Sequence, residues 1–147
     1  MSDENVNALV EGLIMTLEAL KVDRPSAWSE SFEGLSPLDL HVLGIAGAKP
    51  DVILKEIKDY LDVPNSTLTG IVDRLERKRL IERTISDRDR RSYGLKLTDR
   101  GREIREEQRR IRKAAAARML DALDSEDERD AFVALVAKIG ERMQTEG

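Results

Sequence analysis

The stretch Pro64–Thr98, PNSTLTGIVDRLERKRLIERTISDRDRRSYGLKLT, changes from a helical to an alternating pattern partway along. In its first half, apolar residues recur at Leu68, Ile71, Val72 and Leu75, the spacing of one buried helix face. The opposite face is small and polar at its start and basic at its end. Short side chains let a helix enter a DNA groove, and arginines reach phosphates. This half therefore predicts a short helix suited to reading DNA.

The second half has the pattern of a β-hairpin. Ile81 and Ile85 alternate with polar residues in one run, and Tyr93, Leu95 and Leu97 alternate in the next. The segment between them, SDRDRR, is polar and highly charged. A candidate reading helix followed by a hairpin with an arginine-rich tip is typical of a winged helix-turn-helix. The residues expected to bind DNA are Ser66, Thr67, Thr69, Gly70, Arg74, Arg77, Arg88, Asp89, Arg90 and Arg91.

The charge is unevenly distributed along the 147 residues. The net charge is −4, but residues 64–118 hold 17 Lys and Arg against 9 Asp and Glu, whereas the remainder holds 8 against 20. Local potential governs attraction to phosphate, so an acidic total does not exclude nucleic acid. Charged runs also form ordinary solvated helix faces, which we expect for much of residues 100–113.

A helix is predicted over residues 36–47. Ser36 suits the N-cap position, Pro37 the first helical position, and Asp39 the third, where a carboxylate meets the positive helix end. Gly47 suits a left-handed helix end.

The next helix is predicted over residues 51–61, with Asp51 as its N-cap. Its expected buried side is Ile53, Leu54, Ile57, Tyr60 and Leu61. A four-residue turn, 62–65, then leads into the reading helix. Two short helices joined in this way form a helix-turn-helix unit.

Helices with apolar stripes lie near both ends of the chain. One is predicted over residues 5–20, a long polar helix follows Thr98 to about Leu123, and Ser125 starts a capping box for the last helix. We expect these stripes to intertwine with a second copy. Twofold symmetry suits a palindromic site with half-sites about 34–36 Å apart.

The predicted fold class is mainly α: a winged helix-turn-helix with a two-stranded β-hairpin wing and N- and C-terminal dimerisation helices. The expected parts are an N-terminal dimerisation helix and loop (1–34), the DNA-binding domain (35–98), and a linker helix with the C-terminal dimerisation helix (99–147). No membrane-spanning run or signal-peptide pattern is present. The lack of cysteine excludes disulfides, so we expect a cytoplasmic protein with no cofactor.

Trp28, Phe32 and His41 are the candidates for binding a small ligand. The alternative, which we favour for the two aromatic residues, is that they anchor a loop on the core. A single histidine cannot form a metal site alone. No glycine-rich phosphate loop or nucleophile motif indicates an enzyme.

The order of these motifs resembles the MarR family of transcriptional regulators. The resemblance covers nearly the whole chain and is strongest over residues 35–105. Its most specific part is Asp89-Arg90-Arg91 followed by Leu97-Thr98-x-x-Gly101. The resemblance implies an all-α dimer apart from the wing, which usually represses genes until a ligand weakens DNA binding.

Carried over by position, Ser66, Thr67, Thr69 and Arg74 would meet the major groove or its phosphates. Arg91 would enter the minor groove, where negative potential is concentrated, with Asp89 holding its guanidinium. An alternative for Asp89 is ordinary turn chemistry.

Two positions depart from the family pattern. Gly70 stands where many members carry a larger, often basic residue, and Arg79 stands where a glycine commonly ends the reading helix. The lack of cysteine excludes the thiol-based peroxide sensors, and the single histidine argues against the zinc sensors.

The sequence therefore predicts a homodimeric regulator that binds double-stranded DNA, expected to be a repressor, with no membrane partner. The sequence does not reveal an effector; the resemblance implies that a small aromatic or phenolic ligand is possible. The alternative is a winged-helix dimer that binds protein without specific DNA binding.

Overall fold

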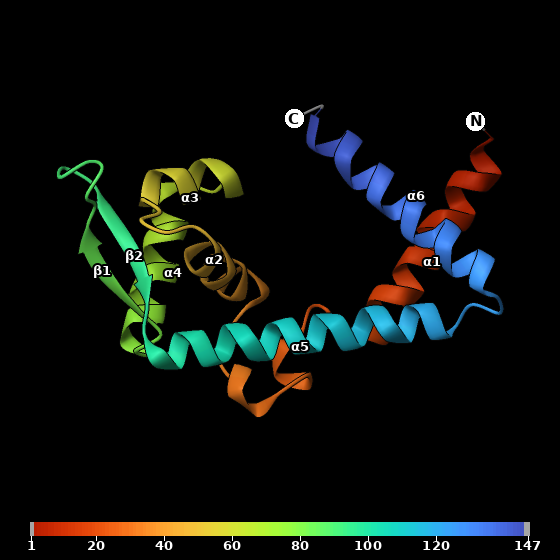
Figure 1. Ribbon diagram of the computed structural model, residues 1–147, viewed down its shortest axis with the longest axis horizontal. Helices are drawn as coiled ribbons and strands as arrows, with labels where there is room; N and C mark the ends of the chain where they lie inside the picture. The colour runs from red at the N-terminus through yellow and green to blue at the C-terminus, as the bar shows by residue number, and fades with distance from the viewer. Residues whose placement is uncertain (1, 146–147) are drawn as a thin grey trace. The chain divides into compact units, whose positions relative to one another are not determined.

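The computed structural model describes residues 2–145. The elements follow in the order α1 (Asp3–Leu20), the 3-10 turns η1 (Pro25–Ala27) and η2 (Glu30–Phe32), α2 (Pro37–Ala48), α3 (Leu54–Leu61), α4 (Asn65–Arg77), β1 (Ile81–Ile85), β2 (Tyr93–Leu97), α5 (Asp99–Asp121) and α6 (Glu126–Thr145) (Figure 1). This mainly helical architecture with one hairpin confirms the predicted fold class. The chain divides into two compact units, the first ending at Arg109 and the second starting at Arg110.

Helix α2 begins as predicted and ends differently. The Ser36 hydroxyl accepts a hydrogen bond from the Asp39 amide at 3.1 Å, and the Asp39 carboxylate accepts one from the Ser36 amide at 2.8 Å. The prediction that Gly47 ends the helix was wrong, because α2 continues to Ala48. A Cβ at position 47 would lie 2.8 Å from Cδ1 of Leu97 and 2.6 Å from Nε of Arg105, so this glycine allows close packing.

Helix α3 begins at Leu54, so the predicted start and the N-cap role of Asp51 were wrong. Asp51 has φ +52°, and the carbonyl of Val52 accepts a hydrogen bond from the Leu95 amide at 3.2 Å. The chain is therefore extended beside β2 before it can turn into a helix. The expected burial of Tyr60 was also wrong, since that side chain is 68% exposed.

Helix α4 follows a three-residue turn, 62–64, and buries the predicted stripe: Leu68, Ile71, Val72 and Leu75. The two strands pair antiparallel in the predicted hairpin, with Ile81 opposite Leu97 and Ile85 opposite Tyr93. The alternation holds at the base, where Ile81, Leu95 and Leu97 are buried. Ile85 and Tyr93, nearer the tip, are 66% and 59% exposed, because the hairpin extends beyond the core there.

The junction between α4, the hairpin and α5 is tightly packed. Arg79 adopts φ +57°, the left-handed geometry in which glycine is usual. The Thr98 hydroxyl donates a hydrogen bond to the Arg79 carbonyl at 2.7 Å and accepts one from the Gly101 amide at 3.0 Å. A Cβ at Gly101 would overlap the carbonyl oxygen of Leu80. The Leu-Thr-x-x-Gly motif therefore joins the hairpin and α5 to the end of α4.

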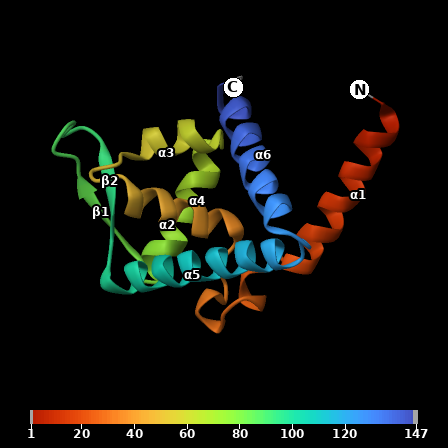
Figure 2. The ribbon, with the colours of Figure 1, turned by 45° about the vertical axis from the view of Figure 1, so that its right-hand side comes forward.

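The core lies where α2, α3 and α4 pack together and against the hairpin. Figures 1 and 2 show these three helices grouped beside the strands in both views. The largest fully buried apolar side chains are Phe32, Leu40, Leu43, Ile57, Leu75 and Ile81. They hold α4 with its polar face outward.

Helices α1 and α6 contain no buried residue in the part of the chain that the structure describes. On α1, Leu9, Leu13 and Leu17 are exposed, and on α6 Val136 and Ile139 are exposed. No helix within residues 2–145 is long and apolar enough to cross a membrane.

Candidate nucleic-acid interface

The outer face of α4 is open and polar. Ser66, Thr67, Thr69 and Gly70 are all exposed, and a Cβ at Gly70 would meet nothing within 4 Å. Pro64 occupies the N-cap position and provides no side-chain hydrogen bond to the first turn. The amides of that turn therefore remain available, and amides at a helix N-terminus favour phosphate. This face can approach a nucleic acid closely.

Arg74 lies on α4 but is directed toward α2. Its Nη2 lies 2.7 Å from Oδ1 of Asp39, and its Nε lies 3.0 Å from Oδ2. The Asp39 side chain is fully buried, while that of Arg74 is 38% exposed. Hydrogen bonding to Asp39 raises the pKa of Arg74 above its usual value. In the structure this guanidinium joins the reading helix α4 to α2, whereas we expected it to reach DNA.

Arg77 and Arg83 lie near the end of α4. Arg77 is exposed, and its Nε donates a hydrogen bond to the Asp73 carbonyl at 3.3 Å. Arg83, on β1, forms ion pairs with Asp73 at 2.5 Å and with Glu76 at 3.5 Å. Arg77 would therefore lose only this hydrogen bond if it turned toward DNA. Arg83, in contrast, already connects the hairpin to α4 through its two ion pairs.

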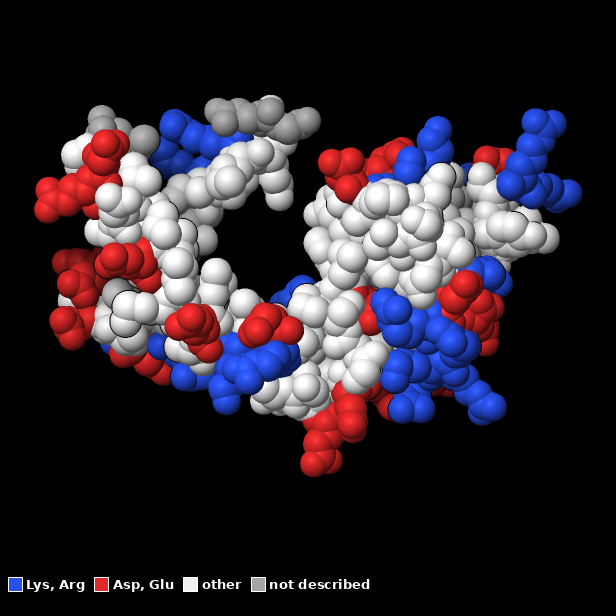
Figure 3. Space-filling view, turned by 180° about the vertical axis from the view of Figure 1, so that it is seen from behind, with Lys and Arg blue, Asp and Glu red and all other residues white. Residues whose placement is uncertain are grey.

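The tip of the wing presents two free cations. Arg90 and Arg91 are exposed, and within residues 2–145 neither side chain has an ion-pair or hydrogen-bond partner. Figure 3 shows basic side chains projecting at its right-hand edge, where the hairpin lies. A guanidinium that protrudes in this way can enter the narrow negative channel of a minor groove.

Asp89 organises the backbone of the tip. Its carboxylate accepts hydrogen bonds from the Arg91 amide at 3.0 Å and from the Ser92 hydroxyl at 2.7 Å. The bond from Ser92, followed by the one from Arg91, lowers the pKa of Asp89. We expected this carboxylate to hold the Arg91 guanidinium; the structure instead shows the turn chemistry that was the alternative.

Arg88 points away from the tip, toward α3. Its Nη2 lies 2.8 Å from Glu56 Oε2 and 2.7 Å from the carbonyl oxygen of Asp51. Its Nη1 lies 3.2 Å from Glu56 Oε1. The hydrogen bond from Arg88, together with one from Lys49, lowers the pKa of Glu56 to about 2. Of the three predicted wing arginines, Arg88 is therefore the one whose side chain has partners within residues 2–145.

The three candidate ligand residues have different surroundings: Trp28 and Phe32 contact each other, and His41 contacts Tyr60. Phe32 is fully buried, with its ring 6.5 Å from that of Trp28, and the Trp28 indole donates a hydrogen bond to the Leu20 carbonyl at 2.7 Å. This arrangement is the loop anchor that we favoured. His41 is exposed on α2, and its ring lies edge-on to Tyr60 at 6.0 Å.

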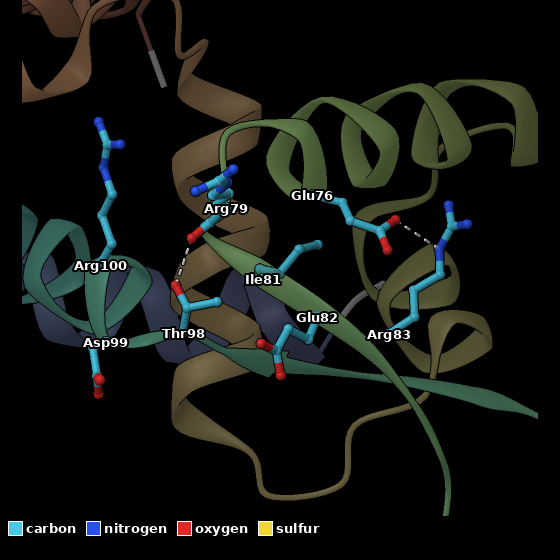
Figure 4. Close-up of a pocket in the computed structure, with 8 residues that line it drawn as sticks. All are labelled: Glu76, Arg79, Ile81, Glu82, Arg83, Thr98, Asp99 and Arg100. Atoms are coloured by element: carbon cyan, nitrogen blue, oxygen red, sulfur yellow. Dashed lines mark hydrogen bonds and ion pairs between the residues drawn. The ribbon is translucent and has the colours of Figure 1, made fainter.

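A pocket of about 820 Å³ lies where α4, β1 and α5 meet (Figure 4). Its lining includes none of the predicted site residues: Glu76, Arg79, Ile81, Glu82, Arg83, Thr98, Asp99 and Arg100. The charges of both signs in this lining do not select one class of ligand. Within residues 2–145, no group of three or more His, Asp or Glu side chains is placed to hold a metal ion.

The sequence analysis missed the residues that position the candidate DNA-binding groups. Asp39 pairs with Arg74 across 35 positions, and Asp51 accepts a hydrogen bond from Ser86 across another 35. Asp39 was noticed only as a helix cap, and Ser86 only as part of a polar loop. A local sequence pattern does not indicate a pairing between residues that lie 35 positions apart in the chain.

Comparison with known proteins identifies the family. The MarR family model matches residues 33–92. The HTH-type transcriptional repressor MdtR of Bacillus subtilis is 32% identical over 145 residues, which cover 97% of this chain and 93% of the relative.

Two solved structures extend the likeness. FabT of Streptococcus pneumoniae in complex with DNA has a TM-score of 0.81 at 25% identity, covering 99% of this chain and 100% of FabT. The transcriptional repressor CouR bound to a 23-mer DNA duplex has a TM-score of 0.64 at 28% identity, covering 90% and 89%. Neither the fold nor the family supports an enzyme. The chain belongs to the MarR family of winged helix-turn-helix transcriptional regulators.

Proposed function

We propose that this protein represses transcription by binding a palindromic operator as a homodimer. The observation that carries the proposal is the combination of an open polar face on α4 with two wing-tip arginines, Arg90 and Arg91, that have no side-chain partner among the described residues. The first suits the major groove and the second suits the neighbouring minor groove. The protein-binding alternative offers no comparable use for an arginine-tipped wing. The DNA complexes of FabT and CouR, and the repressor MdtR, support the same conclusion.

The proposed DNA-contacting residues fall into two groups. The exposed residues would touch DNA directly: Ser66, Thr67, Thr69, Gly70, Arg77, Arg90 and Arg91. Asp89 would shape the turn that carries Arg91. Arg74 acts indirectly, by holding α4 against α2 through Asp39.

The proposed dimer uses the exposed apolar stripes of α1 and α6. A stripe that meets water on an isolated chain is covered most economically by a second copy, because burying apolar area is the main favourable term in association. Two copies would place two reading helices about 34–36 Å apart, one turn of DNA. The parts of the chain would then be dimerisation segments over 1–34 and 99–147 and a DNA-binding domain over 35–98.

Effector control and location belong to the same proposal. A small aromatic or phenolic acid would weaken DNA binding, although Phe32 is a core residue and leaves only Trp28 and His41 with accessible surface. We place the protein in the cytoplasm, where its operator would be.

The test is a titration of the purified protein against its own upstream DNA, with scrambled DNA of equal length as the control, at two salt concentrations. Selective binding of two protomers per site that weakens as salt rises supports the proposal, because each neutralised phosphate releases counterions. Equal affinity for both DNAs would favour the protein-interaction module.

A further inference from the structure

Arg88 lies among the wing arginines in sequence, but its surroundings differ from those of Arg90 and Arg91. It bonds to Glu56 through two nitrogens, at 2.8 and 3.2 Å, and to the Asp51 carbonyl at 2.7 Å. Nε adds a longer contact with the Asp51 carboxylate at 3.4 Å. These acceptors lie at the start of α3 and in the turn before it, so one side chain connects the wing to the helix-turn-helix.

A buried hydroxyl reinforces this connection. Ser86 is fully buried, and its Oγ donates to the Asp51 carboxylate at 2.9 Å. The same oxygen accepts hydrogen bonds from the amides of Arg88 at 3.2 Å and Asp89 at 3.3 Å. Ser86 therefore adds a second connection between the backbone leading to the tip and Asp51, beside that of the Arg88 guanidinium.

The charges around Arg88 explain why it points inward. Glu56 is 30% exposed and also pairs with Lys49 at 2.8 Å, while Asp51 is 26% exposed. Burial alone would raise the pKa of Asp51, but the hydrogen bonds from Ser86 and Arg88 outweigh it and lower that pKa. Both carboxylates are thus ionised at neutral pH, and a guanidinium offers them several donors in a fixed geometry.

We propose that Arg88 is a positioning residue, whose bridge from the wing to Asp51 and Glu56 sets the direction in which Arg90 and Arg91 are presented to DNA. It acts through the fold of the wing and does not itself bind phosphate. This inference rests on the proposed DNA-binding function, and it assigns to Glu56 a favourable role in DNA affinity although its charge repels phosphate.

The test is whether removing the charge of Glu56 weakens or strengthens DNA binding. Glu56→Gln and Asp59→Asn each remove one negative charge from α3, and within residues 2–145 Asp59 has no ion-pair or hydrogen-bond partner. Simple electrostatics predicts that both variants bind the upstream DNA fragment more tightly. Positioning predicts that Glu56→Gln binds roughly fivefold more weakly, the effect of about one lost net hydrogen bond, while Asp59→Asn does not.

Arg88 variants separate positioning from phosphate binding. Arg88→Lys keeps the charge but cannot donate to the same set of acceptors, so we expect it to bind DNA as weakly as Arg88→Gln. The salt dependence of both should match that of the unaltered protein. A phosphate contact would instead leave Arg88→Lys near full affinity and reduce the salt slope of Arg88→Gln by about 0.9 per protomer.

Hydrogen exchange of the protein without DNA tests whether the Arg88–Glu56 bridge orders the wing. The amides of Arg88 and Asp89 should exchange faster in Glu56→Gln than in Asp59→Asn, while core amides remain unchanged. Equal exchange at the wing, or equal DNA affinity of the two variants, would overturn the positioning role. If the unaltered protein shows no selectivity for its upstream DNA, the proposed function fails first and this inference fails with it.

Discussion

Arg74 of α4 and Asp39 of α2 are joined by three nitrogen–oxygen contacts, of 2.7, 3.0 and 3.2 Å, across 35 positions of sequence. The same carboxylate caps α2 by accepting a hydrogen bond from the Ser36 amide. One buried acidic group thus fixes both the start of α2 and the orientation of the reading helix.

Arg74→Ala should destabilise the protein, because it leaves the buried Asp39 carboxylate without its cation. We expect a loss of about 2–3 kcal/mol in the free energy of unfolding, less than for a fully buried pair because Arg74 is partly exposed. Denaturant unfolding measures it. Arg77→Ala is the control on the same helix and should change stability by no more than about 0.5 kcal/mol. DNA binding by folded Arg74→Ala should keep its salt slope; a flatter slope would restore the direct phosphate contact.

Arg91→Ala should weaken operator binding by at least about tenfold, because it removes a protruding cation from the minor groove. The dimer and the unfolding midpoint should not change, since no protein group bonds to this guanidinium in the described residues. Fluorescence anisotropy with labelled operator DNA provides the measurement. Arg24→Ala, which removes an exposed cation from the loop after α1, should bind nearly as well as the unaltered protein. If both variants lost the same amount of DNA affinity, Arg91 would contribute only its charge and not a specific groove contact.

Gly101→Ala should destabilise the fold by roughly 2–4 kcal/mol, because its Cβ would overlap the Leu80 carbonyl oxygen and the backbone would have to shift. Gly70→Ala is the opposite case. Its Cβ meets nothing within 4 Å, so the gain in helix propensity should stabilise the protein by about 0.5–1 kcal/mol. Thermal unfolding of both variants distinguishes these effects. If Gly101→Ala did not change the stability, Gly101 would not be packed tightly against the Leu80 carbonyl.

Glu56 should titrate near pH 2, well below the usual value of 4.5. Because its pKa is lowered in the folded state, its contribution to stability is complete above about pH 4.5 and is lost as the pH falls toward 2. Side-chain carbon NMR can follow this titration directly. In Arg88→Gln the midpoint should rise toward the usual value, since the first cause of the shift is removed. A midpoint near 4.5 in the unaltered protein would show that the bridge is absent in solution.

Leu13→Glu should dissociate the dimer at micromolar concentration, because it places a charge in the apolar stripe of α1. Met15→Glu is the control, since Met15 is also exposed to solvent, at 70% against 51% for Leu13, but lies on the opposite side of the same helix. Analytical ultracentrifugation of both variants gives the oligomeric state. If Met15→Glu also dissociates, or Leu13→Glu remains dimeric, the stripe is not the interface.

The sequence predicted those parts of the fold that depend on local periodicity. The α4 stripe, the paired strands and the Ser36 cap of α2 all follow from side chains a few positions apart, and the structure confirms them. Arg79, which stands where the family commonly has a glycine, takes the left-handed geometry of that glycine. The DNA contacts of individual residues stay predictions.

The wrong predictions have a common cause, which is dependence on distant neighbours. Asp51 has the residue type of an N-cap, but the Val52 carbonyl is already engaged by β2, so the helix starts later. Gly47 has the residue type of a helix end, but it is needed for contact with Leu97 and Arg105. Distant neighbours also supply the carboxylate partners of Arg74 and Arg88, which no local pattern indicates; whether these two arginines also touch DNA stays a prediction.

The wing is fastened at both of its ends, by Thr98 to the Arg79 carbonyl at the base and by Ser86 to Asp51 near the tip. A loop that ordered only on contact with DNA would lose roughly 1–2 kcal/mol of backbone entropy per residue at that moment. Here most of that entropy is already lost when the chain folds. Association should therefore proceed with little rearrangement of the wing, at a rate governed by electrostatic encounter.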